Sequence, residues 1–207
     1  MKAFIYAHGE IFTDGITDFP KGGDISISAD GGYKNAQKLG VNIDFAVGDF
    51  DSGNKSELPR EAEIIEVPAE KDFTDTQLAV DVAIEHGADF IMIIGGLGGR
   101  LDHTLSNLAI LEKLWSMGIR AMITDGKNRV RYIERTSELV PKSVFQYISL
   151  IAADECAKGV SVEGCKYPLK NARLTRTNQF AVSNEILKNC ALISVKKGGL
   201  YIIESKD

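Results

Sequence analysis

The chain has 207 residues, of which 44% are hydrophobic and 26% are charged, as in an ordinary globular protein. Its formal charge of −5 argues against nonspecific nucleic-acid binding, which needs a basic surface. No stretch approaches the ~20 apolar residues of a membrane span, and the first apolar run is too short for a signal peptide, so we expect a cytoplasmic protein that binds neither nucleic acid nor membrane.

Strand-like and helix-like segments alternate over the first part of the chain. The expected strands are short and apolar on both faces, at residues 2–7, 24–28, 44–47, 62–67, 90–94 and 119–124. Amphipathic helices are expected between them, at residues 33–39, 74–86 and 102–117, and each ends at a glycine. This alternation predicts an α/β N-terminal domain, residues 1–125, with a mostly parallel, Rossmann-like sheet.

The pattern changes at residues 124–128, and no convincing helix follows. Short strands are expected at residues 129–134, 143–152, 159–163, 173–175, 190–196 and 200–204. Turn residues are expected to separate them, at Ser137-Glu138, Pro141-Lys142 and Lys197-Gly198-Gly199. We therefore predict an all-β, sandwich-like C-terminal domain of residues 126–207.

Two further patterns in this half have ordinary structural interpretations. Basic residues alternate along the expected strand, and we interpret them as a solvent-facing row: Lys127, Arg129, Arg131 and Arg135. The cysteines are odd in number and form no CxxC pattern, which argues against a disulfide framework or a zinc site. We interpret them as small buried thiols: Cys156, Cys165 and Cys190.

Polar clusters follow the expected strands of the first half, where ligands bind in parallel sheets. Glycine lets a backbone approach phosphate closely, and carboxylates hold Mg²⁺. The clusters are Asp30-Gly31-Gly32, then Gly48-Asp49-Phe50-Asp51, then Lys71-Asp72-Phe73-Thr74-Asp75, and finally residues 95–103. Four such clusters in one α/β pattern predict a single magnesium–polyphosphate site.

Each of the first two clusters has a structural alternative. Asp49 and Asp51 are two residues apart at a strand end, so their side chains point to one side and repel unless a cation lies between them. Equally, they can cap backbone amides in a loop. Asp30 is either a site residue or a helix N-cap. The glycines beside it, Gly31 and Gly32, suit either a close ligand or a tight turn.

The third cluster precedes a helix that opens with a Thr-x-x-Gln capping box. That box explains Thr74 as the N-cap and Asp75 as a first-turn acid that suits the helix dipole. It does not explain Lys71 and Asp72, which lie just outside the helix, where an anion would be held.

The fourth cluster is a glycine-rich loop that leads into a helix. It is neither a Walker A loop nor a dinucleotide fingerprint, because the required Gly-Lys-Ser/Thr and the last glycine are missing. Arg100 suits a bidentate phosphate contact. Asp102 either caps the helix or joins a metal shell, and His103 either bonds within the turn or transfers a proton. Asn107 follows one turn later on the same face as His103.

Ser183 and Asn184 follow a polar loop in the second half. Their side chains suit hydrogen bonds to a heteroaromatic ring. A β-turn between strands is the stronger local interpretation.

Taken together, these segments resemble the thiamine pyrophosphokinase family, whose motifs they match in order over nearly the whole chain. The match rests on residues 29–32, 47–52, 71–75, 99–103 with Asn107, 164–169 and 183–185. The resemblance implies an ATP-binding α/β catalytic domain, a thiamine-binding and dimerisation β domain, and a homodimer. The implied enzyme is a Mg²⁺-dependent transferase that moves pyrophosphate from ATP to the thiamine hydroxyl and releases thiamine diphosphate and AMP.

The resemblance also assigns site residues. The catalytic and metal-binding set is Asp49, Asp51, Asp72, Asp75 and Asp102. The ATP- and phosphate-binding set is Asp30, Gly31, Gly32, Lys71, Thr74, Gly96, Arg100, His103 and Asn107. The thiamine-binding pair is Ser183 and Asn184. His8 receives no role, because family members more often have small residues after the first strand.

Two rival functions explain part of the pattern. Another Mg²⁺-dependent nucleotide enzyme, such as a hydrolase, accounts for the carboxylates but gives Ser183 and Asn184 no purpose. A non-catalytic sensor of nucleotide or thiamine would bind both ligands and consume no ATP. A purely structural interpretation would make four glycine–acid clusters coincidental turns.

Overall fold

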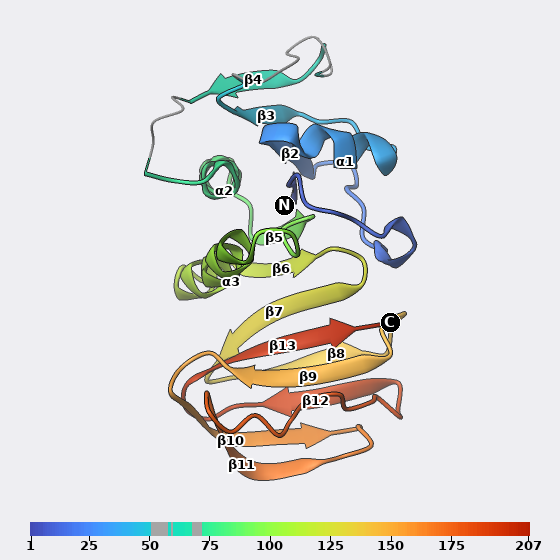
Figure 1. Ribbon diagram of the computed structural model, residues 1–207, viewed down its shortest axis with the longest axis vertical. Coiled ribbons are helices and arrows are strands. Elements are labelled where there is room, and N and C mark those ends of the chain that lie inside the picture. The colour runs from blue at the N-terminus through green and yellow to red at the C-terminus, as the bar shows by residue number, and fades with distance from the viewer. Residues whose placement is uncertain (51–57, 59, 68–71) are drawn as a thin grey trace. The chain divides into compact units, whose positions relative to one another are not determined.

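The computed structural model describes residues 1–50, 58, 60–67 and 72–207 (Figure 1). The chain divides into two compact units, Met1–Gly126 and Lys127–Asp207. In the parts of the chain that the structure describes, no helix is both long enough and apolar enough to span a membrane.

The N-terminal unit is built on parallel strands. These are β1 (Lys2–Tyr6), β2 (Ile25–Ala29), β3 (Phe45–Gly48), β4 (Glu63–Glu66), β5 (Phe90–Ile94) and β6 (Arg120–Thr124). They lie in the order β4-β3-β2-β1-β5-β6, and all their pairings are parallel, so the predicted parallel sheet is confirmed. The chain moves outward from β1 to β4 and then returns to the other side of β1, which places a topological switch point between β1 and β5.

Helices cover both faces of these strands (Figure 1). They are α1 (Tyr33–Lys38), α2 (Asp75–Glu85) and α3 (Leu101–Ser116), with short 3₁₀ turns at Thr13–Gly15 and Asp30–Gly32. Phe4, Tyr6 and Met92 pack with Ala36 of α1 on one face. The intervening side chains, such as Ile5 of β1, are fully buried on the opposite face, which explains why these strands are apolar on both sides.

Helix α2 begins at the predicted capping box. The backbone N–H of Gln77 donates to Thr74 Oγ1 at 3.2 Å, and the Thr74 N–H donates to Gln77 Oε1 at 2.9 Å. The helix ends before Gly87, whose φ of +80° suits a residue without a side chain. Local sequence signals therefore set both ends of this helix.

Replacing Thr74 by alanine should remove the N-cap of α2 and leave the Gln77 N–H without its acceptor. We expect the free energy of unfolding to fall by about 1 kcal/mol. Urea unfolding of Thr74→Ala, with Thr74→Ser as the variant that keeps the hydroxyl, measures the effect. Equal losses in the two variants would show that the hydrogen bond does not stabilise the helix.

The C-terminal unit contains strands and no helix, as predicted. Its strands are β7 (Asn128–Glu134), β8 (Ser137–Pro141), β9 (Tyr147–Ala152), β10 (Cys156–Glu163), β11 (Leu169–Thr175), β12 (Cys190–Ser194) and β13 (Gly199–Ser205). Antiparallel pairing gives the orders β7-β13-β9 and β11-β10-β12-β8. Ile148 of β9 lines one small apolar cavity together with Val162 of β10 and Ile193 of β12, so the two groups of strands face each other.

Strand β8 corrects the sequence prediction, which placed turns at Ser137-Glu138 and Pro141-Lys142. The strand pairs with β12 along its whole length, from Ser137 opposite Ser194 to Pro141 opposite Cys190. Val140 is its only buried residue. An edge strand covered on one side needs few apolar residues, so its sequence looks like a turn.

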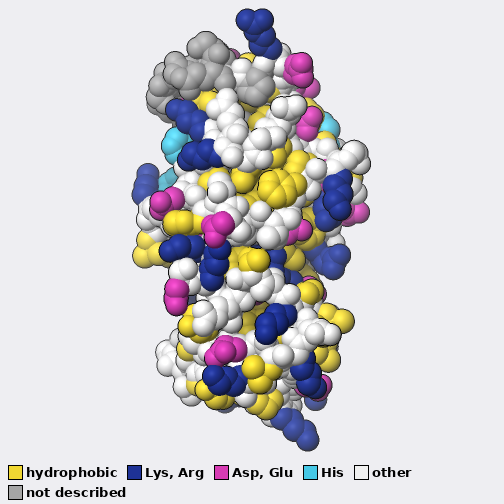
Figure 2. Space-filling view, turned by 90° about the vertical axis from the view of Figure 1, so that its right-hand side faces the viewer, with side chains coloured by type: hydrophobic (Ala, Val, Ile, Leu, Met, Phe, Trp, Pro, Cys, Tyr) yellow, Lys and Arg dark blue, Asp and Glu magenta, His cyan; other side chains and the backbone are white. Residues whose placement is uncertain are grey.

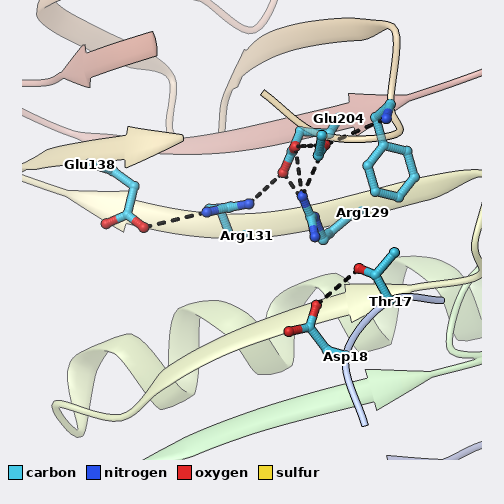
Figure 3. Close-up of polar contacts among 8 residues, drawn as sticks. Thr17, Asp18, Arg129, Arg131, Glu138 and Glu204 are labelled. Atoms are coloured by element: carbon cyan, nitrogen blue, oxygen red, sulfur yellow. Dashed lines mark hydrogen bonds and ion pairs between the residues drawn. The ribbon is translucent and has the colours of Figure 1, made fainter. Parts of the chain in front are cut away.

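The predicted solvent-facing row of basic residues is also wrong for two of its members. Arg131 is 5% exposed and Glu204 is 1% exposed, and Arg129 is largely covered. Arg129 donates to both carboxylate oxygens of Glu204, at 2.9 and 2.8 Å, and Arg131 also donates to Glu204. Figure 3 shows this arrangement, with Glu138 contacting Arg131 from the other side at 3.4 Å. The charges of Arg129 and Arg131 are therefore compensated by paired carboxylates and not by water.

The three cysteines are free thiols. Cys165 is buried, and burial raises the pKa of its thiol. Cys156 and Cys190 are only partly buried, so the predicted burial holds for one of the three.

Candidate active site

The predicted residues of the N-terminal unit lie on loops at the carboxyl ends of parallel strands. Asp30 follows β2, Asp49 follows β3 and Gly96 follows β5. The loop after β2 touches the end of β3, because a Cβ atom on Gly48 would lie 3.2 Å from Asp30 Cα. Parallel pairing therefore brings clusters that are far apart in sequence to one edge of the strands.

Left-handed backbone occurs at several positions of this edge. Asp30 and Phe50 each have a φ of +47°, although neither is a glycine, and Gly95, Gly98 and Gly99 also have positive φ angles. Such conformations are costly for residues with side chains and often occur at functional sites. The N-cap of α1 is Gly32, so the alternative that Asp30 caps this helix is excluded.

Gly31 and Gly32 have a packing reason to lack side chains. A Cβ atom on Gly32 would lie 1.8 Å from the carbonyl oxygen of Tyr6, and one on Gly31 would lie 1.9 Å from Nδ1 of His8. Close packing against the end of β1 and the loop after it, which neither of the two interpretations named, therefore explains why both residues are glycines. Any contact between these glycines and a ligand involves their backbone atoms.

The glycine loop after β5 is held to helix α3 by two side chains. Asn107 is buried and its Nδ2 donates to the Gly96 carbonyl at 2.8 Å. Thr104 Oγ1 donates to the Gly98 carbonyl at 3.1 Å. Asn107 therefore positions the loop. Sequence reasoning missed Thr104, whose spacing three residues before Asn107 on the same helix was the available signal.

Arg100 and Asp102 form a bidentate ion pair at the end of this loop. Arg100 Nε lies 3.1 Å from Asp102 Oδ1, and Nη2 lies 2.6 Å from Oδ2. The N-cap of α3 is Arg100, so Asp102 does not cap the helix. The hydrogen bond from Arg100 lowers the pKa of Asp102 to about 2, and the backbone N–H of His103 assists by donating to Oδ1. Asp102 is therefore a carboxylate at neutral pH.

The remaining predicted acids lie beside helix α2 or outside the described residues. Asp75 is in the first turn of α2 and Asp72 is exposed just before it, while Thr74 is occupied by the capping box. Asp51 and Lys71 lie outside the described residues.

Carboxylates are suitable Mg²⁺ ligands, so the donor chemistry of this edge fits the predicted ion. Among the described residues, no three His, Cys, Asp or Glu side chains gather closely enough to hold a metal on their own. Mg²⁺ in nucleotide enzymes commonly uses one or two carboxylates and completes its shell with water and phosphate oxygens. A site of that kind needs no cluster of three acids.

The loop after β1 is held by a residue of helix α1 that sequence reasoning missed. Asn35 of α1 is buried, and its Nδ2 donates to the carbonyl oxygens of Ala7 and Gly9, both at 2.7 Å. The Gly9 N–H donates to the Gly95 carbonyl at 3.0 Å. This network joins the loops on both sides of the switch point. A polar residue on the buried face of a short helix was the available signal.

In the C-terminal unit, Asn184 clamps a neighbouring segment. Its Oδ1 accepts from the backbone N–H groups of Tyr167 and Glu185, at 3.0 and 2.9 Å, and its Nδ2 donates to the Tyr167 carbonyl at 2.7 Å. Ser183 is exposed, has a φ of +55°, and donates its N–H to Ser149 Oγ at 2.9 Å. The amide of Asn184 therefore positions Tyr167, which is itself largely exposed.

Comparison with known proteins identifies the family. The catalytic-domain model of thiamin pyrophosphokinase matches residues 18–123, and the vitamin B1 binding-domain model of the same enzyme matches residues 136–200. The thiamine pyrophosphokinase of Bacillus subtilis is 34% identical over 186 residues, which are 87% of each chain. The chain belongs to the thiamin pyrophosphokinase family. The two matched regions fall within the two compact units.

Solved structures of thiamin pyrophosphokinases have the same fold. The crystal structure of the Bacillus subtilis enzyme matches all of both chains with a TM-score of 0.88 at 31% identity. That of Geobacillus thermodenitrificans covers 100% of this chain and 98% of its own, with a TM-score of 0.86 at 28% identity. Transfer of pyrophosphate from ATP is the known reaction of thiamin pyrophosphokinases, so the predicted family and enzyme class are confirmed.

Proposed function

We propose that this chain transfers the terminal pyrophosphate of ATP to the hydroxyethyl arm of thiamine, giving thiamine diphosphate and AMP. The observation that carries the proposal is the gathering of the polar clusters at the carboxyl edge of a parallel sheet. The strand order, with its switch point between β1 and β5, supports a Rossmann-like description of this part of the chain.

The proposed nucleotide site uses charge to hold and orient the triphosphate. Asp49, Asp51, Asp72, Asp75 and Asp102 form the set from which Mg²⁺ takes its carboxylate ligands. When bound, the ion supplies charge neutralisation at the phosphates. The planar guanidinium of Arg100 forms a bidentate contact with the two carboxylate oxygens of Asp102. Phosphate oxygens suit the same bidentate geometry.

The remaining phosphate contacts come from the loops. Backbone N–H groups of the glycine loop approach the phosphates because Asn107 fixes the loop at Gly96. Lys71 adds positive charge, and Asp30, Gly31, Gly32, Thr74 and His103 complete the proposed lining.

The reaction requires positioning more than covalent chemistry from the protein. The thiamine hydroxyl oxygen forms a bond to the β-phosphorus as the bond from that phosphorus to the bridging oxygen of AMP breaks. The hydroxyl proton leaves to a base, and AMP carries away the electron pair of the broken bond. Holding the two substrates in line supplies much of the rate.

Thiamine is proposed to bind at the C-terminal unit, beside Ser183 and Asn184. The hydrogen bonds of Asn184 to the Tyr167 backbone support this placement, because they fix the backbone of a residue whose exposed aromatic ring is of the kind that stacks on heterocycles. A homodimer in the cytoplasm belongs to the same proposal. Exposed apolar side chains such as Leu139 and Leu192, directly opposite each other on β8 and β12, support a subunit contact. Figure 2 shows hydrophobic side chains among charged ones on one face of the surface.

An AMP-release assay with and without thiamine tests the proposal. We expect AMP and thiamine diphosphate in equal amounts, and no release without thiamine or after chelation of Mg²⁺. Nucleotide breakdown that ignores thiamine would indicate a hydrolase instead. Binding of both ligands with no product would indicate a sensor.

A further inference from the structure

His8 lies at the position where the topology of the sheet places a ligand. It follows β1, whose carboxyl end faces the switch point between β1 and β5. In open parallel sheets the ligand crevice forms at such a point, because the loops on its two sides run in opposite directions. His8 is exposed there, whereas the apolar residues before it are buried.

The backbone around His8 is fixed from two sides. Asn35 donates to the carbonyls of Ala7 and Gly9, one residue on each side of His8. The Ala7 N–H donates to the Ile94 carbonyl at 2.8 Å, and the Gly9 N–H donates to the Gly95 carbonyl at 3.0 Å. The loop is therefore tied to α1 and to β5, and residue 8 is held at its outer bend.

One face of the His8 ring is packed against the protein. It lies against Gly31, since a Cβ atom at that position would come within 1.9 Å of Nδ1 and 2.5 Å of Cε1. The loop that carries Asp30 therefore leaves room for this imidazole. An exposed side chain with a fixed backbone and one packed face is preorganised for binding.

We propose that His8 contacts the phosphate chain of the bound nucleotide, which makes it a further binding residue of the site described above. The inference rests on the proposed function. An imidazole N–H is a good donor to phosphate oxygen. The neighbouring loops contribute backbone N–H groups and the carboxylate of Asp30. His8 adds a side-chain donor at the centre of the carboxyl edge of the parallel strands. The part of the ligand that His8 contacts is the polyphosphate of a nucleoside triphosphate.

NMR of the histidine side chains tests this directly, because the chain has only three histidines. The imidazole resonances of the whole protein are followed during titration with a nonhydrolysable ATP analogue and Mg²⁺. His8→Gln identifies its signal. We expect the His8 resonance to shift saturably and that of His86 to stay in place, since His86 follows α2 at the opposite end of the sheet and packs on Phe45.

Calorimetry with the same analogue provides the second measurement. His8→Ala should weaken binding by about tenfold, the loss expected for one hydrogen bond to a charged group. The matched control His86→Ala should bind as tightly as the original protein. If the His8 variants fail to fold, His86→Gln and His103→Gln assign the other two histidine resonances, and the remaining one in the unmodified protein decides the question.

The outcomes separate this inference from the proposed function. An analogue that binds without shifting the His8 resonance, or that binds His8→Ala at full affinity, would overturn the role of His8 and leave the reaction standing. A protein that binds no analogue and releases no thiamine-dependent AMP would overturn the proposed function and this inference with it.

Discussion

Replacing Asp49 by asparagine should lower turnover by about 10²- to 10³-fold, the range found when one electrostatic group is removed from an active site. Asp49 follows β3 directly, beside Phe50 with its left-handed backbone, and lies at the edge where the triphosphate is proposed to bind. Asparagine keeps the shape of the side chain and removes its charge. The measurement is the rate of thiamine-dependent AMP release at saturating Mg²⁺ and ATP.

Asp81→Asn is the matched control for this experiment. Asp81 lies on α2 and forms an ion pair with Lys113 that is exposed on both sides. Exposed pairs of this kind contribute about 0–1 kcal/mol, so both turnover and folding should be retained. Normal turnover in Asp49→Asn would remove Asp49 from the site. Loss of the folded state, seen by circular dichroism, would point to a structural role.

Replacing Glu204 by glutamine should lower the free energy of unfolding by about 3–5 kcal/mol, the cost of breaking a buried ion pair. Glu204 is 1% exposed and accepts hydrogen bonds from Arg129, Arg131 and Ser143. Without the carboxylate, two guanidinium groups would face each other with less compensating negative charge. Urea unfolding followed by fluorescence and circular dichroism measures the change.

Glu134→Gln serves as the control for the buried pair. Glu134 belongs to β7 and pairs with Arg135, which is largely exposed. We expect its loss to change the free energy of unfolding by less than about 1 kcal/mol. Similar values for Glu134→Gln and Glu204→Gln would contradict the importance assigned to the buried cluster.

Elements with local signals were predictable from the sequence. Helix α2 begins and ends where its capping box and Gly87 predict, because both signals act within a few residues of the helix ends. The central parallel strands β1 and β5 were found because they are covered on both faces and so carry continuous apolar runs. The rule that ligands bind at the carboxyl ends of such strands then indicated Asp30, Asp49 and the glycine loop.

Features that depend on distant partners were not predictable. Arg129 and Arg131 appeared to be solvent-facing because their partner, Glu204, is 75 and 73 residues away along the chain. Asn35 contacts two carbonyls of another loop, and nothing in its own segment shows which atoms it meets. His8 received no role because the family pattern was applied to it, whereas the strand rule alone would have marked it.

The central claim is that the loops after β1, β2, β3 and β5 bind the triphosphate of ATP. A crystal structure with a nonhydrolysable ATP analogue, Mg²⁺ and thiamine tests it most directly. We predict phosphates at the carboxyl ends of β1 and β5, with Asp49 directed toward the metal and the thiamine hydroxyl in line with the β-phosphorus. A nucleotide bound elsewhere on the protein, with Asp49 contacting neither metal nor phosphate, would contradict the account.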